Sequence, residues 1–112
     1  MIFWDTSAVV PLLVRERSSP VVESLLHSDA LMAVWWATPI EVVSAITRRE
    51  RDRSLTRLEA DRARDGLGTF GGAWDEVLPS EDIRSQAKRV LLRYPLSGAD
   101  ALQLAAALTW SS

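Results

Sequence analysis

Short apolar runs alternate along the chain with stretches in which apolar residues recur every three or four positions. Three of the runs have the length of strands and end in polar or turn-forming residues; they are residues 2–4, 31–36 and 74–78. Residues with helical spacing separate each run from the next. Strands separated by helices pair in parallel through right-handed crossovers, so the pattern predicts an α/β fold with helices layered on a parallel sheet.

The predicted helices differ in how clearly a buried face can be assigned to them. In the helix that begins at Thr38, the residues Ile40, Val43 and Ile46 follow one another at offsets of three and predict its buried stripe. Val42 and Ala45 are expected to widen this apolar surface. Residues 99–110 are apolar on nearly every side, which predicts a helix packed between the sheet and neighbouring helices. Helices are also predicted over three other segments, residues 8–14, 20–28 and 83–94.

Residues 48–68 are strongly charged and predict a helical arm on the surface of a single domain that comprises residues 1–112. Gly66 and the three glycines after it predict the end of this helix. Ion pairs between residues four apart on a solvated helix are typical of such a segment, and a flank that contacts phosphate groups is the alternative. The arginines concerned are Arg48, Arg49, Arg51, Arg53, Arg57, Arg62 and Arg64.

Composition excludes several classes of protein. The 112 residues carry 13 basic and 15 acidic side chains, a net charge of -2, which argues against a strongly basic nucleic-acid binder. Cysteine is absent and His27 is the one histidine, so disulfides, thiolate metal sites and a cysteine nucleophile are excluded. His27 is expected at the surface or near a helix end. No apolar stretch reaches the ~20 residues that span a bilayer, so we expect a cytoplasmic protein with no membrane partner.

Three acids lie where the carboxyl ends of the predicted strands meet. Asp5 comes directly after the first strand, Glu41 lies in the first turn after the second, and Asp100 lies in the first turn of the last helix. Ligands bind at this edge of parallel sheets, and carboxylates brought together there favour a cation. Mg²⁺ suits oxygen ligands best and Mn²⁺ is the alternative, so all three acids are candidate metal ligands and catalytic residues. Thr6 and Ser7 are expected to hydrogen-bond Asp5 or a water on the metal, or to cap the helix.

Helix capping is an alternative role for each acid. Thr38-x-x-Glu41 and Ser97-x-x-Asp100 both match the capping box, in which the acid at the third position bonds back to the cap residue. Asp5 is placed to cap the first helix. The two roles are compatible, because a helix start can orient a carboxylate that also faces a metal.

Three short segments occur in a particular order along the chain. They are residues 5–8 (Asp-Thr-Ser-Ala), 38–42 (Thr-Pro-Ile-Glu-Val) and 98–105 (Gly-Ala-Asp-Ala-Leu-Gln-Leu-Ala). In this order, and over the whole chain, they resemble the PIN domain, most closely the VapC-type toxins of bacterial toxin–antitoxin modules. The resemblance implies a three-layer α/β/α fold and a magnesium-dependent endoribonuclease that acts as a toxin. It also implies an RNA substrate, a cognate antitoxin protein as partner and a homodimer.

The resemblance further implies roles for the acids, with one departure from the family pattern. Asp5, Glu41 and Asp100 match the first three acids of the family, so they are expected to hold a cation that assists hydrolysis of the phosphodiester bond. A fourth acid, which the family carries on a strand after the last helix, has no counterpart before Ser112. The fold is therefore expected to lack the last strand or strands. The first strand is then expected at an edge of the sheet that is unpaired or covered by a partner protomer.

Other classes of function match the residues less well. The main alternative is a catalytically impaired PIN-like module that binds an antitoxin or a partner protomer without cleaving RNA, which the missing fourth acid favours. A response-regulator receiver needs a lysine at a strand end, whereas the sole lysine, Lys88, lies within a predicted helix. A phosphatase of the haloacid dehalogenase type needs a second aspartate two residues after the first, where this chain has Ser7.

Overall fold

The computed structural model describes residues 1–112, with three strands and six helices. The strands are β1 (Ile2–Trp4), β2 (Met32–Trp35) and β3 (Asp75–Val77). The helices are α1 (Thr6–Leu13), α2 (Ser19–Ser28), α3 (Thr38–Arg51), α4 (Arg57–Gly71), α5 (Glu81–Arg93) and α6 (Gly98–Ser111). The strands pair in parallel in the order β1-β2-β3, with Phe3 opposite Ala33 and Val34 opposite Glu76. The predicted parallel α/β fold is therefore confirmed, and β1 lies at an edge of the sheet, as expected.

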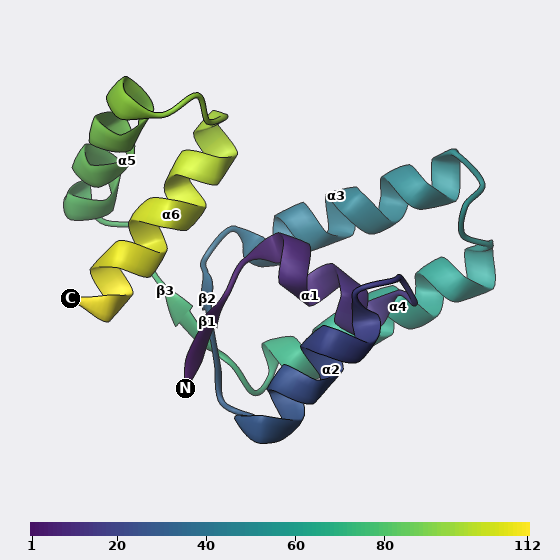
Figure 1. Cartoon of the computed structure of the whole chain (residues 1–112). Helices are drawn as coiled ribbons and strands as arrows, with labels where there is room; N and C mark the ends of the chain where they lie inside the picture. The colour runs from purple at the N-terminus through teal and green to yellow at the C-terminus, as the bar shows by residue number, and fades with distance from the viewer.

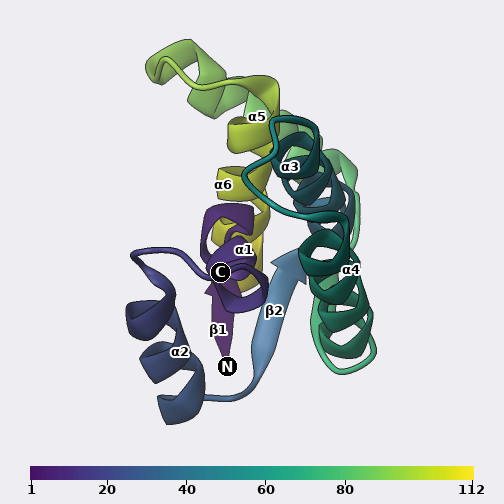
Figure 2. The same cartoon turned by 90° about the vertical axis from the view of Figure 1, so that its right-hand side faces the viewer.

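Helices cover both faces of the sheet, so the fold has three layers (Figure 1, Figure 2). Helices α1 to α4 pack on one face, and α5 and α6 pack on the other. Because side chains of a strand point alternately to the two faces, β2 contributes to two cores. Met32 and Val34 join the larger core with Ile46, whereas Trp35 joins the smaller core with Ile83. The starts of α1, α3 and α6 meet at one end of the sheet, around a common cavity.

The buried face of α3 differs from the predicted one. Thr38, Val42 and Ile46 are fully buried, whereas Ile40 is 64% exposed and Val43 is 40% exposed. The predicted buried stripe is therefore wrong for Ile40 and Val43, whereas Ile46 and the flanking Val42 are buried as predicted. The buried residues of α3 recur every four positions, beginning with the polar Thr38, and this row forms the face that packs on the core. Ile40 instead lines the cavity at the end of the sheet.

The helix pair α5 and α6 leaves an open groove. Ala101, Ala105 and Ala106 of α6 are buried against α5 and the sheet. Leu104 and Leu108 line a groove between α6 and α5 and are partly exposed. The prediction that α6 is covered on nearly every side is therefore wrong on this flank, because α5 packs along the helix without filling the groove. No helix combines the length and the apolar character that crossing a bilayer requires.

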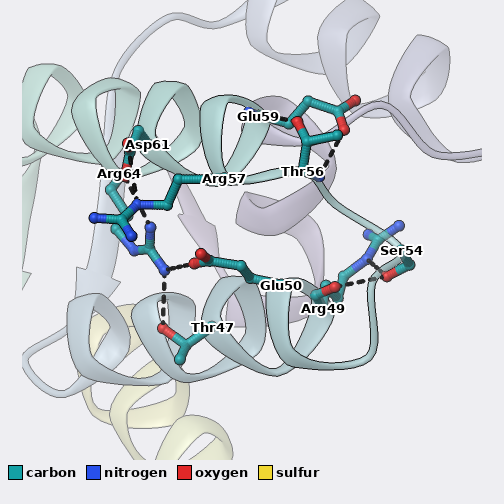
Figure 3. A network of polar contacts seen from close by, with 9 residues as sticks. All are labelled: Thr47, Arg49, Glu50, Ser54, Thr56, Arg57, Glu59, Asp61 and Arg64. Carbon is teal, nitrogen blue, oxygen red and sulfur yellow. Dashed lines mark hydrogen bonds and ion pairs between the residues drawn. The ribbon is translucent and has the colours of Figure 1, made fainter.

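The charged segment 48–68 comprises the end of α3, a turn and most of α4, and the two helices lie side by side (Figure 1, Figure 3). Leu55, Ala60 and Leu67 of this segment belong to the larger core. Arg53 in this turn has a left-handed backbone, with φ of 67°. Thr56 and Glu59 form a capping box at the start of α4. Arg64 of α4 donates a hydrogen bond to Glu50 of α3 at 2.5 Å, and this bond raises the pKa of Arg64 above its usual value. Polar contacts therefore join the two helices, in addition to the predicted ion pairs within a helix.

Helix α4 continues through two of the glycines that were predicted to end it. Gly66 and Gly68 both lie within α4. A Cβ at Gly66 would lie 2.9 Å from Leu13 Cδ2 of α1, so the Leu13 side chain packs closely over the α4 backbone at this glycine. Glycine costs about 1 kcal/mol in a helix interior relative to alanine. Burial of Leu67 on the same helix offsets that cost.

Candidate functional site

A cavity of about 690 Å³ opens at the carboxyl ends of β1 and β2. The three acids singled out in the sequence, Asp5, Glu41 and Asp100, all line it. Thr6 and Ser7 also belong to the lining. The fold therefore brings together side chains that begin α1, α3 and α6, as the rule for ligand sites in parallel sheets leads one to expect.

Asp5 caps α1 and faces the cavity at the same time. Its main-chain carbonyl accepts hydrogen bonds from Ala8 N at 2.9 Å and Val9 N at 3.1 Å. Its Oδ2 accepts from Ser7 N at 3.0 Å and from Ser7 Oγ. The positive end of the helix dipole also favours a carboxylate here. The predicted capping role of Asp5 and the hydrogen bond from Ser7 are confirmed, and Oδ1 of Asp5 accepts no hydrogen bond.

Glu41 is held by residues from two other helices. Its Oε1 accepts from Thr6 Oγ1 at 3.0 Å and from Gln103 Nε2 at 3.2 Å, whereas Oε2 accepts no hydrogen bond. The N-cap of α3 is Ala37, with no side-chain cap bond, and the buried Thr38 Oγ1 lies 3.0 Å from Gln103 Nε2. The predicted capping box of Thr38 and Glu41 is therefore wrong, because both side chains turn toward Gln103.

Asp100 is the most open of the three acids. It lies in the first turn of α6, and its main-chain N donates to Oγ of Ser97, the N-cap residue, at 3.1 Å. The carboxylate of Asp100 is exposed and returns no bond to the cap, so half of the predicted capping box of Ser97 and Asp100 forms. Both carboxylate oxygens remain free.

Gln103 is a residue of the site that the sequence pattern did not reveal. It lies in the second turn of α6 and is 4% exposed. In addition to its contacts with Thr38 and Glu41, its Nε2 donates to Thr6 Oγ1 at 2.8 Å. The sequence does contain one indication of this role, because Gln103 is the one polar residue in the apolar run 101–108. A buried polar side chain in such a run needs a hydrogen-bond partner.

The cavity also has a basic edge. Arg48 and Arg49 of α3 line it. Arg49 forms an ion pair with Glu16, whereas Arg48 is exposed and forms neither an ion pair nor a hydrogen bond. An unpaired guanidinium beside a cavity is suited to contact a phosphate group. Arg48 is therefore a structural candidate for the phosphate contact that was the alternative role of the arginines.

The carboxylates of the cavity do not converge on one point as they lie. No group of three or more histidine, aspartate or glutamate side chains is placed to hold one metal ion. Their donor chemistry suits Mg²⁺ or Mn²⁺, because the lining offers carboxylates and hydroxyls and contains neither histidine nor cysteine. Asp5 Oδ1, Glu41 Oε2 and both oxygens of Asp100 accept no hydrogen bond. These residues therefore fit a hard divalent cation in donor type, and all three line one cavity.

Three acids at the carboxyl ends of parallel strands, with an unpaired arginine at the edge of their cavity, define an α/β protein with an acidic candidate active site. Ribonuclease VapC45 of Mycobacterium tuberculosis (strain CDC 1551 / Oshkosh) is 31% identical to the chain over 109 residues, which cover 96% of this chain and 75% of the relative. Ribonuclease VapC49 of Mycobacterium tuberculosis (strain ATCC 25618 / H37Rv) has the same identity and coverage. The chain therefore belongs to the VapC ribonuclease family. No protein-family model matches the sequence.

Proposed function

We propose that the protein is a magnesium-dependent endoribonuclease, the toxin of a toxin–antitoxin module, that hydrolyses phosphodiester bonds in RNA. Similarity to VapC ribonucleases supports the activity. The observation that carries the proposal is the shared cavity of Asp5, Glu41 and Asp100 at the carboxyl ends of β1 and β2. The lining holds no cysteine or histidine for covalent catalysis, and His27 is exposed in the last turn of α2. These features favour metal-assisted hydrolysis.

The free carboxylate oxygens are the proposed metal ligands. Asp5, Glu41 and Asp100 would hold the cation, which when bound supplies Lewis-acid activation of water and charge compensation at the phosphate. Thr6 donates to one oxygen of Glu41, and Ser7 donates to one oxygen of Asp5. Each of these two carboxylates therefore keeps one fixed oxygen and one free oxygen. Groups fixed before the substrate binds need less reorganisation during the reaction.

A cognate antitoxin protein and a second copy of the chain are the proposed partners. Both proposals follow from the resemblance to VapC-type toxins. Support for a protein partner in the structure comes from the open groove between α5 and α6, whose lining includes Leu92, Tyr94, Leu104 and Leu108. Exposed apolar side chains that lie together are typical of protein interaction surfaces.

Removal of divalent cations is expected to abolish RNA cleavage. Purified protein incubated with total RNA and Mg²⁺ should produce discrete fragments, and excess chelator should stop their formation. Adding Mg²⁺ or Mn²⁺ beyond the chelator should restore cleavage with a saturable dependence on cation concentration, because the proposed ligands are carboxylates. Gel electrophoresis of the RNA gives the rates.

The Asp100→Asn variant serves as the control for a contaminating nuclease, since its preparation should give no cation-dependent fragments. Cleavage that continues unchanged in chelator would contradict the proposal. Saturable Mn²⁺ binding without cleavage of any RNA would instead support the non-catalytic interaction module.

Replacing Arg48 by alanine is expected to weaken RNA binding while leaving the chemical step largely intact. Loss of one charge-assisted contact of about 1.5 kcal/mol corresponds to an increase in KM of about 10-fold. The salt dependence of binding should become shallower by about 0.7 in log–log slope, the contribution of one phosphate contact to a single strand. Arg51→Ala is the matched control, because Arg51 is exposed on the same helix, has no ion pair and lies outside the cavity lining. Equal KM values for the two variants would exclude Arg48 from the RNA contact.

A further inference from the structure

The buried amide of Gln103 has only one orientation that satisfies its neighbours. A carboxylate can only accept hydrogen bonds, so the group that faces Glu41 Oε1 must be the Nε2 amine. Thr6 already donates its hydroxyl hydrogen to Glu41, which leaves its lone pairs to accept from Gln103. The amide therefore points Nε2 into the cluster. Its Oε1 is left buried without a hydrogen-bond partner, which costs free energy that the bonds of Nε2 offset.

These bonds determine which oxygen of Glu41 is available. Oε1 accepts from Thr6 Oγ1 and from Gln103 Nε2, whose two hydrogens are shared among Glu41, Thr6 and Thr38, so both lone pairs of that oxygen face donors. Oε2 stays free in a residue that lines the cavity. Glutamate has three rotatable side-chain bonds, so without both donors the carboxylate would sample several positions. Gln103 thus helps to fix Glu41 with one oxygen engaged and one oxygen free.

The same bonds also relate Asp100 to the other two acids. Gln103 follows Asp100 by three residues on α6 and therefore lies on the same face of that helix. The other buried contacts of α6 are made by alanines such as Ala101 and Ala105. Apolar contacts depend little on direction, so they do not by themselves fix where the helix lies along its neighbours. The hydrogen bonds to Thr6 and Glu41 therefore fix the position of α6 relative to α1 and α3.

We infer that Gln103 is a positioning residue for the acid cavity: by donating to Thr6 and Glu41 across the layers, it fixes one oxygen of Glu41 and the place of α6, which carries Asp100, so that these two acids can share a divalent cation with Asp5. This inference rests on the proposed function, because the cation site is part of it. Partners that orient metal ligands contribute to affinity without touching the ion.

The direct test is Mn²⁺ binding measured by isothermal titration calorimetry in the absence of RNA. Gln103→Leu keeps the size of the buried side chain and removes the donors, and it should weaken Mn²⁺ binding by about 10–100-fold. The matched control is Gln86→Leu, which removes the one other glutamine of the chain, from α5, where it bonds only Arg89. Gln86→Leu should bind Mn²⁺ like the wild type.

A spectroscopic test uses the wild-type protein and does not depend on a variant that folds. The chain has two glutamines and no asparagine, so a ¹H–¹⁵N spectrum contains two side-chain NH₂ pairs, from Gln86 and Gln103. On titration with Mg²⁺, the Gln103 pair should shift saturably, with the affinity that calorimetry gives, and the Gln86 pair should not. Thr6→Val should shift the Gln103 pair without any metal, because it removes one acceptor.

The outcomes separate this inference from the proposed function. If the wild type binds Mn²⁺ and Gln103→Leu binds it equally well, the positioning role is wrong while the metal-dependent function stands. If the wild type binds no Mn²⁺ and cleaves RNA without it, the proposed cation site fails and the positioning role fails with it. If Gln103→Leu does not fold, a Gln103 NH₂ pair that is unmoved at saturating Mg²⁺ overturns the inference.

Discussion

Asp5→Asn is expected to lower the rate of RNA cleavage by at least about 100-fold, the upper end of the effect of losing a residue that merely orients a metal ligand. Asparagine keeps the size of the side chain and removes the charge proposed to bind the cation. The fold should persist, because asparagine is as good an N-cap as aspartate and its amide oxygen can accept the bond from Ser7 N. Initial rates at saturating Mg²⁺ give the effect, and circular dichroism with thermal unfolding checks the fold.

Asp82→Asn is the control for removal of an acid at a helix start. Asp82 lies in the first turn of α5 and is exposed, and it does not line the acid cavity. This variant should retain cleavage within about twofold of the wild type, since surface changes away from a site have small effects. Full activity of Asp5→Asn would sink the assignment of the cavity as the catalytic site.

Ile46→Ala is expected to lower the free energy of unfolding by about 2–5 kcal/mol, the usual cost of truncating a buried isoleucine to alanine. Ile46 is fully buried in the larger core, where it packs with residues of β1, β2 and α1. The loss is a large part of the roughly 5–15 kcal/mol that stabilises a typical domain. Urea unfolding at equilibrium, followed by circular dichroism, measures it.

Ile40→Ala makes the same chemical change six residues earlier on the same helix. Because Ile40 is 64% exposed, its truncation should change the free energy of unfolding by no more than about 0.5 kcal/mol. Similar losses for Ile40→Ala and Ile46→Ala would contradict the orientation of α3 on the sheet.

These two isoleucines also show how far the sequence predicts the fold. The strands could be located because each apolar run is short and ends in residues that stop a strand, and the alternation with helices then implied parallel pairing. The buried face of α3 could not be assigned in the same way. A period of 3.6 residues fits offsets of three or four, and the direction in which α3 packs on the sheet decides between them. That direction placed Thr38 in the core and Ile40 in the cavity.

The candidate site was predictable to a similar extent. Asp5 and Glu41 directly follow strands, and Asp100 begins the last helix, so the topology alone brings them to one edge. Their hydrogen-bond partners depend on contacts between distant elements. Gln103 bonds Thr6, which lies 97 residues away, and no local pattern indicates such a pair.

The cavity is built from both helical layers: Asp5 caps α1 and Glu41 belongs to α3, which cover one face of the sheet, whereas Asp100 belongs to α6 on the other face (Figure 1). A ligand gripped by all three would act as a cross-link between the layers, so its binding free energy would add to the free energy of unfolding. Ligand binding would stabilise the packing of the two layers, and the packing would strengthen ligand binding to the same extent, because the two equilibria are linked. Any change that loosens the layers, even deep in either core, would therefore weaken the affinity of the cavity for its ligand.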